Sequence, residues 1–351
     1  MSAANKTLLT VLKYVLSIAG GGLLLWLSIR GVNFDELRAG FREADYLWVG
    51  LGLIVAVLSH WLRAARWVIL FRAAGYESNT MNLFASVMVG NMVNQALPRA
   101  GEISRATVTA RSEKIPLSVT FGTMVTDRIF DVIALGLLVL AVMAMQYKEI
   151  LRIIDKAFST PPDPNAVVDP GMPLWQIIGL AFVGLCLLVF VVFRKKILAS
   201  NLYARLLRFT KETWEAVLSV RKMDQPWLFI LHTIGIWACY VMMTYLVFFS
   251  LGATAGLPFI FALTAFVMGG IGMVFPSPGG IGSYHFAIIM SFVAYGPSFG
   301  WTEQAARTVG TNLAFIIHTS QMIMMILVGL LSYLYLLWKI RLGNEEPPSE
   351  P

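Results

Sequence analysis

Charged side chains interrupt two of the long apolar stretches of this chain. Arg63 and Arg66 are three residues apart, and Asp127 and Asp131 are four apart with Arg128 beside them, so each set lies on one helical face. Ionisable groups inside a bilayer cost roughly 2.5–3.5 kcal/mol each on insertion scales, and therefore face a cavity or a charged partner. Guanidinium forks match phosphate oxygens, whereas carboxylates suit an amine or sugar hydroxyls. These residues predict a pocket compatible with a zwitterion.

Two simpler explanations account for the same charges. The arginine pair and the nearby Arg72 can mark the positively charged end of a span, with side chains that snorkel to the interface. The group from Asp127 to Asp131 can form a salt-bridge network that holds helices together. Either explanation is compatible with a binding pocket formed by the same residues.

One segment occurs twice, at 83–98 and at 263–278, and the copies align without a gap. The identical positions are Leu83/Leu263, Ala85/Ala265, Val87/Val267, Met88/Met268, Gly90/Gly270 and Pro98/Pro278. Each copy runs into a turn, for which the expected residues are Pro98 and Gly101 in the first copy and Pro276, Pro278, Gly279, Gly280 and Gly282 in the second. A duplicated apolar segment broken by proline and glycine is typical of a transporter whose site lies where the repeats meet.

The composition is that of a membrane protein. The chain has 351 residues, of which 57% are hydrophobic and 13% charged, and its mean hydropathy is +0.71, which excludes the soluble globular class. About 20 apolar residues cross the hydrocarbon core. Such runs are expected as spans at 8–29, 47–71, 116–145, 174–193, 226–250 and 312–338. The net charge of +7 comes from basic loops beside spans and does not indicate nucleic acid.

The basic residues also orient the spans. The segment 194–222 and the cluster from Arg99 to Lys114 are rich in lysine and arginine, so both are expected in the cytoplasm. The loop 149–173 carries three aspartates and is expected outside. Basic residues near both termini place these in the cytoplasm as well, at the plasma membrane.

These signs favour an all-α polytopic fold with an inverted repeat. Six full spans combine with two opposed re-entrant hairpins, at 82–112 and 258–296, whose tips meet near the midplane. The repeat units are 47–145 and 226–338, inside a single transmembrane domain 1–351 that ends in a cytoplasmic tail, 339–351. The alternative is eight or nine ordinary spans. The polar return arm 101–114 favours the hairpins, because its charges are unsuited to lipid.

Other chemistries lack their sequence signals. The four histidines show no HExxH spacing, and Cys186 and Cys239 fall inside spans, so we expect neither a metal site nor a disulfide. Walker lysine and nucleophile-elbow motifs are absent from the sequence, and no cofactor is expected. His285, in the second hairpin, can titrate near neutrality or pack as a hydrogen-bonded histidine.

Four motifs in order resemble the flippase-like domain family, the transmembrane region of lysylphosphatidylglycerol synthases. They are 61–67 (WLRAARW), 97–102 (LPRAGE) followed by Arg105, 121–131 (FGTMVTDRIFD) and 276–282 (PSPGGIG). The resemblance covers nearly the whole chain. It implies a protein that moves a lipid or lipid-linked headgroup between leaflets. The family often has a glutamate where this chain has His285, and its aminoacyltransferase domain is not expected here, so synthase activity is not carried over.

Residues and resemblance together predict a transporter of an amphiphile, such as a phospholipid, a glycolipid or a polyprenyl-phosphate carrier, and not an enzyme. The expected site residues are Arg63, Arg66, Arg99, Glu102, Arg105, Asp127, Arg128, Asp131 and His285. The expected partners are membrane lipids or a lipid-linked substrate, with a lipid-modifying enzyme as a further candidate. Two alternatives are a membrane-embedded transferase or its accessory subunit, with Glu102 or Asp131 as base, and a transporter of small solutes or ions.

Overall fold

The computed structural model of this chain describes residues 18–27, 29–30, 34–97, 100–158, 223–275 and 277–345. Every regular element within these ranges is helical, which confirms the all-α class for this part of the chain. Pro98, Arg99, Pro276 and the predicted span 174–193 lie outside the described residues. The predicted span 8–29 is described mainly as a short apolar helix, Ile18–Leu27.

Four long helices have the length and hydropathy needed to cross a membrane. At 1.5 Å per residue, each is longer than the hydrocarbon core of about 30 Å. They are α3 (Tyr46–Ala73), α6 (Leu117–Phe158), α9 (Pro226–Phe248) and α13 (Glu303–Glu345). Helix α6 is kinked at Gln146, where φ is −131° and ψ is 28°. Helix α13 continues past Lys339, so the first residues of the predicted tail are helical. The predicted count of six spans stays a prediction.

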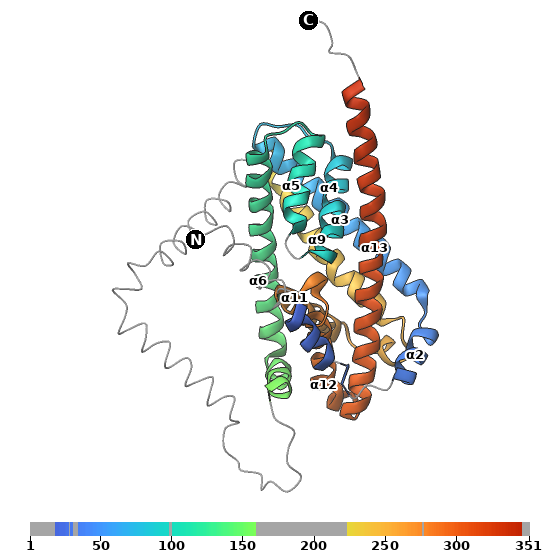
Figure 1. Cartoon of the computed structure of the whole chain (residues 1–351). Helices are drawn as coiled ribbons and strands as arrows, with labels where there is room; N and C mark the ends of the chain where they lie inside the picture. The colour runs from blue at the N-terminus through green and yellow to red at the C-terminus, as the bar shows by residue number, and fades with distance from the viewer. Residues whose placement is uncertain are drawn as a thin grey trace, which may run out of the picture.

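Two helical hairpins lie between the long helices. The first joins α4 (Thr80–Ala96) to α5 (Ala100–Ser112), and the second joins α11 (Phe259–Val274) to α12 (Ser283–Tyr295) through the short helix η2 (Pro278–Gly280). The hairpin helices have only 13 to 17 residues, about 20–26 Å at the α-helical rise. Figure 1 shows α4 and α5 beside one half of α13, and α11 and α12 beside its other half.

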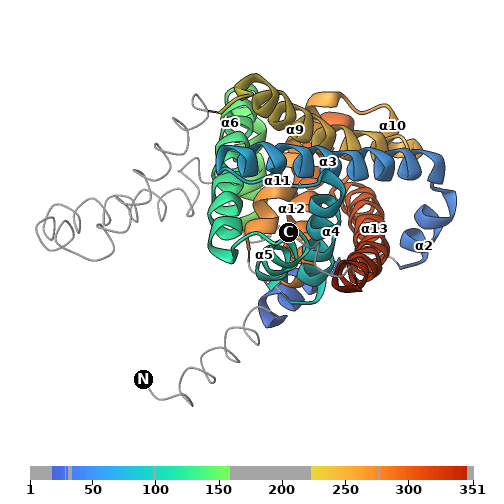
Figure 2. The same cartoon turned by 90° about the horizontal axis from the view of Figure 1, so that it is seen from above.

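Each hairpin packs against a long helix from the other half of the sequence. Helix α4 packs on α13, and α12 packs on α6 as well as on α13, while α3 and α9 share the most extensive contact between long helices. Seen from above, α6 and α13 stand on opposite sides of the hairpins (Figure 2). The hairpins are therefore enclosed by long helices from both halves of the chain.

Glycines permit the closest approaches in the hairpins. Gly279, Gly280 and Gly282 have φ angles of 56°, 79° and 87°, in the region that side chains with a Cβ rarely adopt. Gly282 also lies against the backbone of Gly21, in the helix Ile18–Leu27. Gly101, predicted as a turn residue, instead lies in the first turn of α5, where it packs against α4. Because Gly101 has no side chain, α5 can pack closely against α4 at this position.

The loops at the outer ends of the first hairpin are tied together. Asn79 caps α4 through its side chain, and its backbone N–H donates to Glu113 Oε2 at 2.8 Å. The side-chain amide of Asn82 donates to Glu113 Oε1, and Tyr335 on α13 donates to Asn82 Oδ1 at 3.1 Å. The loop before α4 and the loop after α5 thus lie at the same end of the molecule, with one end of α13.

Candidate functional site

Buried charges from α3 and α6 meet in the middle of the helix bundle. Arg66 and Asp127 are both completely buried. Asp127 Oδ1 accepts from Arg66 Nη2 at 2.7 Å and from Nε at 3.0 Å. Arg66 Nη2 also donates to Asp131 Oδ1 at 2.7 Å, and its Nη1 donates to Thr233 on α9 at 3.2 Å. Short charge-assisted bonds of this kind are the strongest in proteins, so Arg66 joins α3, α6 and α9.

Arg63 lies one turn earlier on the same face of α3. Its Nη1 is 2.8 Å from Asp131 Oδ2, and its Nη2 donates to the Tyr240 hydroxyl on α9 at 2.8 Å. Its Nε is buried and has no hydrogen-bond partner among the described residues. Both arginines therefore face both aspartates.

Arg105 brings a third guanidinium to this cluster from α5. Its Nη2 is 3.6 Å from Asp127 Oδ2, and its Cζ lies 3.8 Å from the centroid of the Trp67 ring, close enough for a cation–π contact. Trp67 is held in turn by a bond from its N–H to Thr123 at 3.1 Å. Arg105 is only 3% exposed, and its Nε and Nη2 have no hydrogen-bond acceptor among the described residues.

Arg128 and Glu102 form the outer part of the cluster. Arg128 Nε is 3.0 Å from Glu102 Oε1, and its Nη1 is 3.5 Å from Asp131 Oδ2. The two side chains are 38% and 41% exposed, so protein encloses this pair much less than the buried ones. Glu102 and Arg128 can exchange partners at low cost.

The buried part of the cluster has an excess of positive charge. Among the described residues, the three arginines at 63, 66 and 105 face the two aspartates at 127 and 131, which leaves a net +1. Arg128 and Glu102 cancel each other. Removing an unbalanced charge from water is costly unless a counter-charge is present. The arrangement therefore suits an anionic group better than a cationic one.

A cavity of about 260 Å³ lies beside the cluster and between the two hairpins. Arg63 and Arg128 both line it. Its other polar lining residues come from five helices and are His60, Asn91, Tyr240, Thr244, Tyr284, His318 and Gln321. Such a mixture of two cations with neutral donors and acceptors can hold a phosphate and its polar substituent.

The second hairpin contributes a cluster of histidine and aromatic rings in place of ion pairs. His285 lies against Phe315 and His318, with ring centroids 4.3 Å and 4.8 Å away. His318 is 2.8 Å from the carbonyl oxygen of Gly279 and stacks on Tyr284 at 5.3 Å. If the alignment of the two copies is continued past Pro98 and Pro278, His285 corresponds to Arg105. The two hairpins thus place different chemistry at equivalent positions.

The tips of the two hairpins meet. A Cβ built on Gly279 would lie 2.7 Å from Gln95 Oε1 and 3.6 Å from Gln95 Cα. Gln95 Nε2 is 3.1 Å from Met325 Sδ on α13. The turn of the second hairpin therefore touches the end of α4 at the edge of the cavity.

The structure brings seven of the predicted site residues together: Arg63, Arg66, Glu102, Arg105, Asp127, Arg128 and Asp131. His285 lies apart from them in the aromatic group, and Arg99 is outside the described residues. Sequence reasoning missed the neutral partners Thr233, Tyr240 and Trp67. The available signal was the presence of hydroxyl groups and indole inside apolar helices, which need a partner when buried.

The described residues contain no group of three histidine, cysteine, aspartate or glutamate side chains that could hold a metal ion. The cluster alternates cations with carboxylates at hydrogen-bond distance, so its carboxylates already have guanidinium partners.

Comparisons with known proteins identify the family of this chain. Residues 11–329 match the family described as the lysylphosphatidylglycerol synthase TM region. A UPF0104 membrane protein of Methanocaldococcus jannaschii is 28% identical over 103 residues, 28% of this chain and 31% of that protein. Another, from Methanothermobacter thermautotrophicus, is 26% identical over 122 residues, 34% of this chain and 36% of that protein.

A third relative carries a different name. Glycosyltransferase AglD of Haloferax volcanii is 26% identical over 115 residues, 32% of this chain and 18% of that protein. The matched stretches thus span about a third of the two UPF0104 proteins and less of the third relative. No solved structure matches the chain.

Proposed function

Because the chain belongs to the family of the lysylphosphatidylglycerol synthase TM region and is an integral membrane protein, we propose that it moves a lipid or a lipid-linked headgroup between the leaflets. The headgroup is bound in the central cavity and the hydrocarbon tails stay in lipid. One observation carries this proposal: two arginines face a polar cavity between two short opposed hairpins, deep among membrane-spanning helices.

The hairpins are proposed to be re-entrant. Their helices are shorter than the hydrocarbon core is thick, and they lie along opposite halves of α13 (Figure 1). A non-helical turn at membrane depth is tolerated where it lines a cavity or is buried in protein. The contact between Gln95 and Gly279 supports tips that meet near the midplane.

We propose further that residues 47–145 and 226–338 are inverted repeat units. In each unit a long helix is followed by a hairpin and a second long helix, and each hairpin packs on the second long helix of the other unit. Rocking of one unit against the other would move both hairpin tips relative to the cavity. Alternating access in inverted-repeat transporters uses such a motion.

The proposed orientation places the first hairpin on the cytoplasmic side of the plasma membrane. Arg72 at the end of α3, Lys114 in the loop after α5, and the end of α13 with Lys339 and Arg341 lie at the open end of that hairpin. Their excess of positive charge favours the cytoplasm. The C-terminus is then cytoplasmic, and we propose the same side for the N-terminus because basic residues lie near it in the sequence.

Reconstitution into liposomes tests the function. Translocation of a fluorescent phosphate-containing lipid, followed by a quencher that reaches only the outer leaflet, should be faster than in protein-free liposomes. Arg128→Gln should slow it at least about tenfold, equivalent to about 1.4 kcal/mol, because Arg128 lines the cavity. The matched control is Arg152→Gln, a half-exposed arginine on the same helix that pairs with Glu149 at 2.6 Å, and it should translocate as the parent does.

The partial similarity to a glycosyltransferase supports a membrane-embedded transferase as second candidate. Formation of a new lipid species in detergent, where no leaflets exist, would favour the transferase. Equal translocation rates in liposomes with and without the parent protein would refute the transport proposal.

A further inference from the structure

An apolar groove of about 620 Å³ runs between α6 and α9 and extends onto the first turns of α11. The residues that define it are Phe130 and Leu137 on α6, Ile234 and Ala238 on α9, and Phe259 and Leu263 on α11. Leu137 and Ile234 are 64% and 61% exposed. The groove lies within segments that are apolar enough to cross a membrane, and the outer surface of such segments faces hydrocarbon in a bilayer.

The groove and the central cavity are lined by the same face of α11. Phe259 and Leu263 line the groove, and Phe266, Gly270 and Met273 line the cavity. These five residues are spaced by four, three, four and three positions and therefore form one stripe on the helix. One surface of α11 thus changes from purely apolar surroundings to the surroundings of the two arginines.

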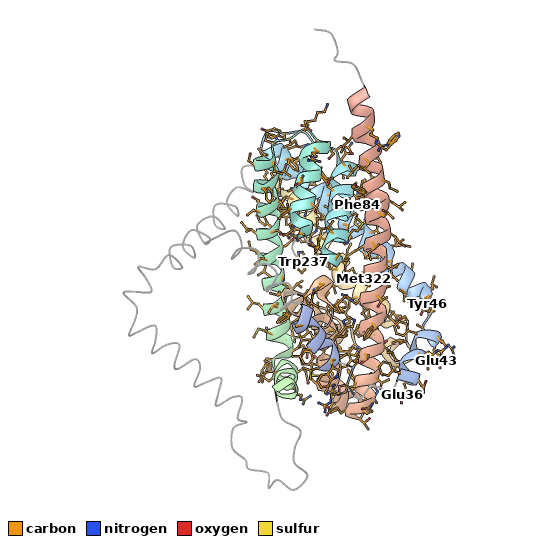
Figure 3. All side chains as sticks on the ribbon, in the orientation of Figure 1. Glu36, Glu43, Tyr46, Phe84, Trp237 and Met322 are labelled. Atoms are coloured by element: carbon orange, nitrogen blue, oxygen red, sulfur yellow. The ribbon has the colours of Figure 1, made fainter. Side chains whose placement is uncertain are left out.

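Trp237 marks the junction between the two spaces. It lines the groove, and its ring meets Tyr240 at 5.7 Å and Phe266 at 6.4 Å, both of which line the cavity. Its label in Figure 3 lies midway along the molecule, between the two hairpins. The indole Nε1 is buried and has no hydrogen-bond partner among the described residues. A buried indole N–H normally has an acceptor.

We propose that the groove between α6 and α9 holds one hydrocarbon chain of the lipid whose phosphate headgroup occupies the cavity at Arg63 and Arg128. The lipid then enters sideways between α6 and α9. This inference rests on the proposed function, and it adds the route of the lipid and the position of its tail.

Three features support this occupant. The groove lining is almost entirely apolar, and removing hydrocarbon from water is worth about 0.8 kcal/mol per CH₂, so a tail stays in apolar surroundings during transport. Arg63, 7% exposed, keeps an unpartnered Nε at the cavity. The Trp237 N–H stands where the headgroup joins its tail, and there it donates to an ester or phosphate oxygen.

Filling the groove tests the proposal. Ala238 is exposed and lines the groove, so the Ala238→Trp side chain occupies the space assigned to the tail. The matched control is Val132→Trp, at a position on α6 that is 64% exposed and outside the groove lining. Two quantities are measured on each purified variant: phospholipid retained, by native mass spectrometry, and translocation of the fluorescent lipid in liposomes.

Ala238→Trp should lose at least about tenfold in both quantities, equivalent to about 1.4 kcal/mol, and Val132→Trp should match the parent. Retention and translocation at parental levels in Ala238→Trp would overturn the groove while the transport proposal stands. If the parent retains lipid but does not translocate it, and Ala238→Trp loses the lipid, the transport proposal fails and the groove stands as a lipid site.

A photo-crosslinking measurement covers the case in which Ala238→Trp does not fold. With p-benzoylphenylalanine at Ile234, the adduct should be enriched in a phosphate lipid relative to the bulk membrane. The same group at Val132 should report bulk lipid composition. An adduct to a peptide from 174–193, the apolar stretch that follows α6 in sequence, would overturn the proposal, as would identical adducts at the two positions.

Discussion

Two isosteric exchanges, Asp127→Asn and Glu102→Gln, separate the structural part of the charged cluster from its functional part. Each replaces a carboxylate by an amide of the same shape and leaves the neighbouring arginines in place. The two carboxylates differ in surroundings: Asp127 is completely buried, whereas the Glu102 side chain is 41% exposed. We expect Asp127→Asn mainly to lose stability and Glu102→Gln mainly to lose transport.

The expected magnitudes follow from the partners of each carboxylate. Asp127 accepts two bonds from Arg66 and lies 3.6 Å from Arg105. Its loss leaves three buried arginines with Asp131 alone, and breaking a buried pair costs about 3–5 kcal/mol. Glu102 makes one partly exposed pair with Arg128, and exposed pairs are worth about 0.2–1 kcal/mol. The difference is a large part of a total stability of about 5–15 kcal/mol.

The assay measures the free energy of unfolding in mixed micelles and the translocation rate in liposomes for both variants. Glu102→Gln should unfold almost as the parent does and translocate at least about tenfold more slowly, a barrier increase of about 1.4 kcal/mol. The physical reason is that Arg128, without its carboxylate, holds an anionic headgroup too tightly at the cavity. Parental transport by Glu102→Gln would refute the role of that carboxylate, and parental stability of Asp127→Asn would refute the energetic importance of the buried network.

Two further outcomes are expected. In a cysteine-free background, Glu77→Cys and Arg111→Cys should react with an impermeant thiol reagent from the same side of the membrane, and Ala253→Cys from the other; reaction of Glu77→Cys and Arg111→Cys from opposite sides would exclude the re-entrant first hairpin. The double variant with alanine at Gly279 and Gly280 should lose about 2–4 kcal/mol of stability, because both residues have positive φ and each left-handed alanine costs about 1–2 kcal/mol; an unchanged melting curve would show that the turn relaxes freely.

Local patterns were sufficient to locate two of the long helices closely. The predicted apolar runs 47–71 and 226–250 differ by only a few residues from α3, Tyr46–Ala73, and α9, Pro226–Phe248. The spacing of Arg63 with Arg66 and of Asp127 with Asp131 correctly placed each pair on one face. Hydropathy, helical period and turn glycines are properties of neighbouring residues, so a sequence reports them directly.

Which helix faces contact one another could be seen only in the tertiary structure. Arg66 meets Asp127 and Thr233, which are far from it along the chain, and Gly101 lies in a helix because α4 packs closely against it. His285 was expected at the site as a residue of the second hairpin, and it lies among Phe315 and His318. The sequence by itself determined which helices form and which residues they carry, because these follow from local chemistry. The tertiary structure decided which charges share a site, because that depends on how the helices cross.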